Sequence, residues 1–168
     1  MSEYADTTFG MDTELLPSHH RWHPWRTLRE QYPHLRVMTT RRLPPGLHGF
    51  NDGLFIWICS SLTQVQRRCA LTHEIIHLER GVFPADAAEE ALVERLTAIR
   101  MITFDELLSA FRWHRHPDPA EMAEELWVTV DVLDTRMRHL DPIEVADLEY
   151  QLGGDWSYSR TEPRHESA

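Results

Sequence analysis

The sequence is poor in several residue types and patterns that mark common protein classes. It contains no lysine, and its two cysteines, Cys59 and Cys69, are too few for a disulfide framework. No apolar run approaches the roughly 20 residues that cross a bilayer. The acidic start "MSEYADTTFGMDTELL" lacks the pattern of a secretion signal. We therefore expect a cytoplasmic protein with reduced cysteines and no membrane contact.

The charge balance is strongly acidic. The 168 residues carry 27 Asp and Glu against 17 basic residues, which gives a formal net charge of −10. Nucleic-acid binding needs a basic surface, so direct binding of DNA or RNA is not expected. The hydrophobic fraction of 42% is typical of a folded globular protein. The length suits one domain, or one domain with a small helical addition.

The first half of the chain predicts a small sheet followed by a long helix. A short helix in "HPWRTLREQY" leads to a strand over 35–39, and "NDG" is a turn signal inside a β-hairpin over 47–60. The strand "LFIWIC" of that hairpin is almost continuously apolar, which predicts that it is well buried. The long helix is expected to begin at a cap between Ser61 and Thr63 and to end at Gly81.

Two histidines four residues apart carry the main functional signal. The run "LTHEIIHLERG" places His73 and His77 one turn apart on one face of the predicted helix, so both imidazoles can reach one metal ion. A catalytic zinc site holds a water beside three protein ligands, and Glu74 can take a proton from that water without binding the metal. A solvated helix face is the alternative, but the apolar neighbours of the motif favour a Zn²⁺ site with Glu74 as general base.

The third ligand must come from outside the motif. The metzincin class would place a glycine three residues and a histidine six residues after His77. Those positions hold Arg80 and Phe83, which excludes the class. Glu79 is two residues past His77 and would point away from the pair. The acidic segment that follows, a second predicted helix from about 86 to 100, offers Asp86, Glu89, Glu90 and Glu94.

The spacing of these acidic residues favours one candidate. In the gluzincin arrangement, the ligand glutamate is followed four residues later by an acidic or amide residue that orients a ligand histidine. Glu90 with Glu94 has this spacing, whereas Glu89 would leave Val93 in the orienting position. Glu90 is therefore the predicted third ligand, and Glu94 is the residue predicted to orient a ligand histidine. Glu89 remains the alternative ligand.

Four segments together resemble a known family. They are "GLHGFNDGLFIWI", "RRCALTHEIIHLERG", "EEALVERLTAIRMI" and "MAEELWVTVDVLDTRMRHL". The chain resembles, over about 22–152, the ImmA/IrrE family of small zinc-dependent metallopeptidases, in the form carried by actinobacteria and their phages. The resemblance implies zinc ligands at His73, His77 and Glu90, and a catalytic role for Glu74.

The resemblance also implies a substrate class and shows two departures. Members of the family make site-specific cuts in an intracellular regulatory protein, typically a helix-turn-helix repressor of a mobile element or stress response. Glu94 stands where the family commonly has Asn or Asp, and Thr103 stands where proline often follows the helix. Neither departure removes a ligand.

The sequence of the last third of the chain predicts two or three short helices that resemble a helix-turn-helix motif. Its many acidic side chains would face phosphates with the wrong charge, so we interpret it as a segment that packs or docks a partner. Trp113 and Trp127 are expected in its core. The predicted fold is α+β: a flexible N-terminal arm (1–20), a zincin-like domain (21–104), a helical, helix-turn-helix-like segment (105–152) and a disordered tail (153–168).

Two functions follow from these patterns. The first is a zinc endopeptidase that cleaves a regulatory protein such as a repressor, and its protein substrate is then its main partner. The alternative is a non-catalytic protein that keeps the metal for stability and acts through its C-terminal helices, in the manner of an antitoxin or anti-repressor. Replacement of Glu74 separates the two, because only the first function needs a general base.

Overall fold

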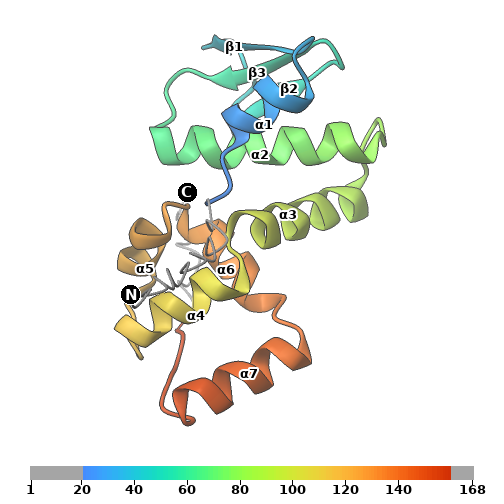
Figure 1. Ribbon diagram of the computed structural model, residues 1–168. Coiled ribbons are helices and arrows are strands. Elements are labelled where there is room, and N and C mark those ends of the chain that lie inside the picture. Colours follow the sequence, from blue (N-terminus) through green and yellow to red (C-terminus); the bar gives the residue numbers. More distant parts are fainter. Residues whose placement is uncertain (1–20, 160–168) are drawn as a thin grey trace, which may run out of the picture.

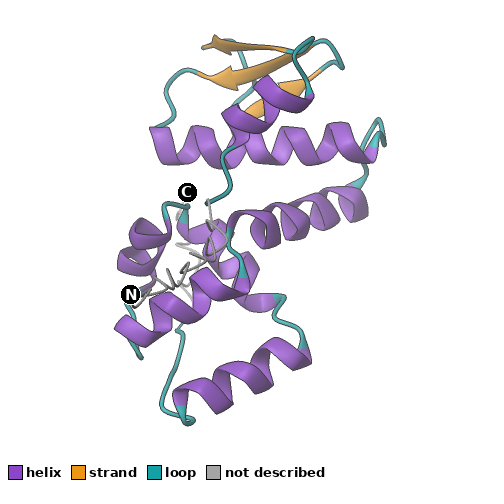
Figure 2. Ribbon diagram, in the orientation of Figure 1, coloured by secondary structure: helices purple, strands orange, loops and turns teal. Residues whose placement is uncertain are grey.

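A computed structural model of the chain describes residues 21–159, so the predicted arm (1–20) and the last nine residues of the predicted tail lie outside the described residues. The fold is α+β, with a small sheet at one end and helices over the rest (Figures 1 and 2). The elements are α1 (Pro24–Gln31), β1 (Arg36–Thr40), β2 (Gly49–Asn51), β3 (Phe55–Cys59), α2 (Gln64–Arg80), α3 (Ala87–Met101), α4 (Phe104–Trp113), α5 (Pro119–Leu126), α6 (Val130–Arg138) and α7 (Pro142–Leu152).

The sheet contains the predicted hairpin. Its strand order is β1-β3-β2, with β1 parallel and β2 antiparallel to the central strand β3, so β2 lies at an edge. The prediction of a well-buried strand over 54–59 holds only in part, because burial alternates along β3 between buried and half-buried residues. Ile56 and Ile58 face the interior with no exposed area, whereas Leu54, just before the strand, is 65% exposed. Only one face of the sheet is therefore covered, by α2 together with Leu28 of α1.

The helix α2 begins and ends close to the predicted positions. Thr63 caps its N-terminus in a capping box with Gln66, and Gly81 ends it in the left-handed conformation at φ +66°. Leu71 and Ile75 have no exposed area and pack on the buried face of β3. Figure 1 shows α2 between the sheet on one side and α3 on the other, which makes it the central element of the fold.

A second core holds the helices together. Its residues include Leu107, Phe111 and Leu133, and it also takes Cys69 from α2 and Met101 from α3. Residues on both sides of position 104 therefore share this core, and α3 packs on both α2 and α6. Within residues 21–159, no helix combines the length and apolar character needed to cross a bilayer.

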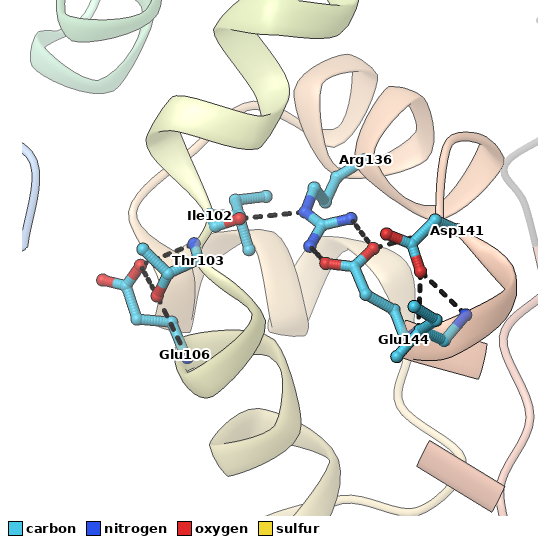
Figure 3. A network of polar contacts seen from close by, with 7 residues as sticks. Ile102, Thr103, Glu106, Arg136, Asp141 and Glu144 are labelled. Carbon is cyan, nitrogen blue, oxygen red and sulfur yellow. Dashed lines mark hydrogen bonds and ion pairs between the residues drawn. The ribbon is translucent and has the colours of Figure 1, made fainter. Parts of the chain in front are cut away.

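A buried arginine joins the ends of three helices (Figure 3). Arg136 of α6 is 1% exposed and donates from Nε to the carbonyl of Ile102, at the end of α3, over 2.9 Å. Its two terminal nitrogens pair with the carboxylate of Glu144 in α7, one of them over 3.0 Å. Glu144 also accepts from the backbone of Asp141, the N-cap of α7. Every nitrogen of this guanidinium therefore has a partner.

Two predictions about the C-terminal part need correction. The tail is not disordered over 153–159, because Trp156 packs on Phe111 and His116 bonds to Asp155 and Ser157. Neither Trp113 nor Trp127 is a core residue, because 77% of the surface of Trp113 and 37% of that of Trp127 are exposed. The helices α5, α6 and α7 agree with the expected short helices.

Candidate metal centre

The pair of helices α2 and α3 carries the candidate metal centre. Two ion pairs join the helices beside it. Arg80 donates to both carboxylate oxygens of Glu89, and Arg100 donates to Glu79 at 2.6 and 2.7 Å. The N-cap Asp86 accepts from the backbone of Glu89, which starts α3 at the position that sets Glu90 opposite α2. Local capping and the two ion pairs thus fix which residues of α3 face the histidines.

The structure brings together the three predicted ligands. The Nε2 atoms of His73 and His77 are 3.0 Å apart, and Oε2 of Glu90 lies 3.4 Å from the first and 3.3 Å from the second. Ligands about 2.0–2.1 Å from a tetrahedral zinc lie about 3.3–3.4 Å from one another. The three atoms therefore have nearly the separations of one face of a zinc tetrahedron. We call these residues the His73–His77–Glu90 cluster.

The choice between the adjacent glutamates is clear in the structure. Glu89 is engaged with Arg80, whereas Glu90 faces both histidines. Glu94 does not take the predicted place behind a histidine, because it is exposed and forms no hydrogen bond or ion pair with a described residue. Glu94 lies one turn beyond Glu90 in α3, and its side chain is exposed to solvent.

The cluster is open on one side. The side chain of His77 is 8% exposed, that of His73 is 26% exposed and that of Glu90 is 46% exposed. The cluster is thus reached from solvent across Glu90 and His73. A closed structural zinc site has four protein ligands, whereas three ligands with an accessible side are typical of a catalytic site.

Glu74 lies under the edge strand β2. It is 6% exposed, and its Oε2 accepts a hydrogen bond of 2.7 Å from Nδ2 of Asn51. The backbone of β2 passes so close that a Cβ on Gly49 would lie 2.7 Å from Oε1 of Glu74. Sequence reasoning treated Asn51 as a turn residue and missed this contact. The signal was present, because alternation in the short strand places both residues 49 and 51 on its buried face.

Burial and neighbouring charges set the protonation of the site. Burial lowers the pKa of His73, and the adjacent His77 ring lowers it further, while the Glu90 carboxylate acts in the opposite direction. His73 is thus held in the neutral form that binds metals. Burial raises the pKa of Glu74, against the opposing effects of the Asn51 hydrogen bond and His77. A raised carboxylate pKa suits a group that both takes and returns a proton.

The second nitrogen of His77 departs from the common pattern of metal sites. A ligand histidine usually donates its other N–H to a carboxylate or carbonyl group. Nδ1 of His77 is buried and has no hydrogen-bond partner among residues 21–159. The ring is instead held by packing, with the Phe83 ring centroid 6.3 Å away.

Comparison with known proteins gives no match: no protein-family model, no curated protein and no solved structure matches the chain. The likeness to the ImmA/IrrE family therefore stays a prediction from the sequence.

Proposed function

We propose that the chain is a zinc-dependent endopeptidase that makes site-specific cuts in a regulatory protein. The observation that carries this proposal is the convergence of three metal-binding side chains from two helices, with a buried carboxylate next to the first histidine. The partly exposed side chains of His73 and Glu90 make the cluster accessible to a water and to a substrate carbonyl group. The donor set of two imidazoles and one carboxylate is the set found in many catalytic zinc sites.

Each residue has a distinct role in this proposal. His73, His77 and Glu90 hold the metal, which when bound supplies a Lewis acid that acidifies a water and polarises a carbonyl group. Glu74 takes a proton from the attacking water and passes it to the leaving amine. Asn51 holds one carboxylate oxygen of Glu74 by its 2.7 Å hydrogen bond, which leaves the other oxygen for proton transfer.

The edge of β2 that is unpaired in the described sheet supports the proposal that the substrate is a peptide. It is paired only with β3 in the described sheet, so its outer backbone groups are available to a further strand. An extended peptide that pairs with this edge would run past Glu74, because the Gly49 backbone lies directly over that carboxylate. The side chain of Phe50, 49% exposed, lies on the opposite face of the strand from Gly49 and Asn51.

The substrate class follows from the sequence resemblance rather than from the geometry. We propose an intracellular regulator such as a helix-turn-helix repressor, and a docking role for the segment that includes α5 and α6. The exposed face of that segment carries Glu121, Glu124, Glu125 and Asp131. This acidic surface favours a basic protein as its partner over nucleic acid.

The proposal is tested by digesting a library of peptides, prepared from a cell extract, with the zinc-loaded chain. We expect cuts in one narrow sequence context, found by mass spectrometry. The Glu74→Gln variant should keep its zinc and lose about 10²–10⁴-fold in cleavage rate, because it cannot accept a proton. Identical cuts by the variant, or no cuts by the zinc-loaded wild type, would contradict the proposal. The second result would favour the non-catalytic alternative.

A further inference from the structure

A separate cavity lies at the other end of α2. It has a volume of about 310 Å³, within the range of small-molecule sites. It is formed where the start of α1, the first turns of α2 and the turn between α5 and α6 meet, so it contains no residue of the metal cluster. The residues that matter for its chemistry are Trp25, Gln64, Arg67, Arg68 and Trp127.

Arg68 is a buried cation that forms no ion pair with any residue of 21–159. It is 2% exposed, and it donates to the backbone carbonyls of Trp127 at 2.6 Å and Trp22 at 2.8 Å. Its guanidinium lies 5.1 Å from the ring centroid of Trp127. No acidic side chain within residues 21–159 forms an ion pair with it, and its Nε is buried without a partner. A buried charge is normally paired, so this arrangement is unusual for a purely structural arginine.

Arg67 adds a second positive charge to the same cavity. It makes one hydrogen bond, from Nη2 to the carbonyl of Ser60 at 2.7 Å, and its Nε also lacks a partner among the described residues. The two guanidinium groups have about five N–H donors each, and three hydrogen bonds to described residues use them. Gln64 brings the N-terminus of α2, with its positive end of the helix dipole, to the cavity wall.

The cavity is thus positive within an acidic protein. None of its lining residues is Asp or Glu, whereas the whole chain has a net charge of −10. Two large aromatic side chains also line it while still exposed, Trp25 at 43% and Trp127 at 37%. Indole rings offer flat apolar surfaces for a planar group.

We infer that this cavity binds a small organic anion with a flat apolar body, such as an aromatic carboxylate. The carboxylate would accept hydrogen bonds from the free donors of Arg67, next to the charge of Arg68. The ring would pack on the indoles of Trp25 and Trp127. A guanidinium group matches a carboxylate in a two-point geometry, which gives the site its preference for this head group. The inference is independent of the proposed peptidase activity.

Calorimetric titration of the zinc-loaded chain with benzoate tests this inference. We expect saturable binding of benzoate, and binding at least about tenfold weaker for benzyl alcohol, which has the ring without the charge. Inorganic phosphate, which has the charge without the ring, should also bind more weakly than benzoate. Equal binding of benzoate and benzyl alcohol would contradict the role of the arginines. Equal binding of benzoate and phosphate would contradict the role of the tryptophans.

Two variants test whether benzoate binds in this cavity. Arg67→Gln should weaken benzoate binding by about tenfold or more, because it removes a charged donor, whereas the control Arg29→Gln, on an exposed arginine of α1, should leave it unchanged. A benzoate bound at the zinc would be insensitive to Arg67→Gln, and that result would overturn the inference. If Arg67→Gln fails to fold, Trp25→Ala decides, with Trp113→Ala as its control. Equal affinities of the Trp25→Ala and Trp113→Ala variants for benzoate would also overturn the inference.

Discussion

The His73–His77–Glu90 cluster and the Arg136 network are both groups of polar side chains between helices, but they differ in how completely their polar atoms are paired. In the Arg136 network each guanidinium nitrogen donates to a carbonyl or to Glu144 (Figure 3). In the metal cluster two imidazole nitrogens lie 3.0 Å apart and share one carboxylate oxygen. The Nδ1 atom of His77 has no partner in the described part of the chain.

This difference separates an arrangement that is complete by itself from one that could hold an ion. A buried network in which every group is satisfied holds one conformation and needs nothing more. Two imidazoles and one carboxylate offer more acceptors than protons, so the three facing ligand atoms can take up a cation. We therefore expect substitutions in the first network to change stability and substitutions in the cluster to change metal binding.

The largest stability effect is expected for Arg136→Ala. It leaves Glu144 partly buried without its cation, so the free energy of unfolding should fall by about 3–5 kcal/mol. At roughly 2–4 °C per kcal/mol for a chain of this size, the melting temperature should fall by about 6–20 °C. Arg138→Ala, on an exposed arginine of the same helix, is the control and should change stability by less than about 1 kcal/mol. Equal effects of the two changes on a thermal melt would show that the network is not structural.

Glu90→Gln compared with Glu89→Gln tests the cluster. Loss of a residue that only supports a metal ligand costs about 10–100-fold in affinity, so loss of the ligand Glu90 should weaken zinc binding at least about 100-fold. Glu89→Gln breaks the ion pair with Arg80 and should leave zinc affinity within a few-fold of wild type. Competition with a fluorescent zinc chelator measures both values. The reverse order of affinities would identify Glu89 as the ligand.

Gly49→Ala is expected to have a smaller effect, which lowers the cleavage rate and leaves zinc binding unchanged. The added Cβ would lie 2.7 Å from Oε1 of Glu74, so the carboxylate has to move. A displacement of about 1 Å at a catalytic group can cost 100-fold, and we expect a cleavage rate about 10–100-fold lower with zinc content unchanged. The measurement pairs peptide cleavage with metal analysis of the same sample. A variant as active as wild type would show that Glu74 does not act from the position seen here.

Local sequence signals predicted the parts of the site that depend on neighbours in the chain. The helical spacing of His73 and His77 and the cap residues Thr63 and Gly81 are encoded within a few residues of each other. Glu90 was predicted as the third ligand from the four-residue spacing between acidic residues that is found in known zinc proteins. The ion pair of Glu89 with Arg80, which supports that choice, is visible only once α3 lies against α2.

The remaining features depend on contacts between distant segments. Asn51 and Glu74 are 23 residues apart, and the pairing of Arg136 with Ile102 spans 34 residues. Trp156 packs on Phe111 although the "GGDWSYS" tail is polar and rich in turn residues. Composition and periodicity describe a segment by itself, so they could not show these pairings.

The most direct measurement of the central claim is the metal content of the purified chain after loading with zinc and removal of the excess. Native mass spectrometry should find about one Zn²⁺ per wild-type chain and none in His77→Ala, while circular dichroism shows both to be folded. A folded wild-type chain that retains no zinc, or a His77→Ala chain that retains as much as wild type, would contradict the account.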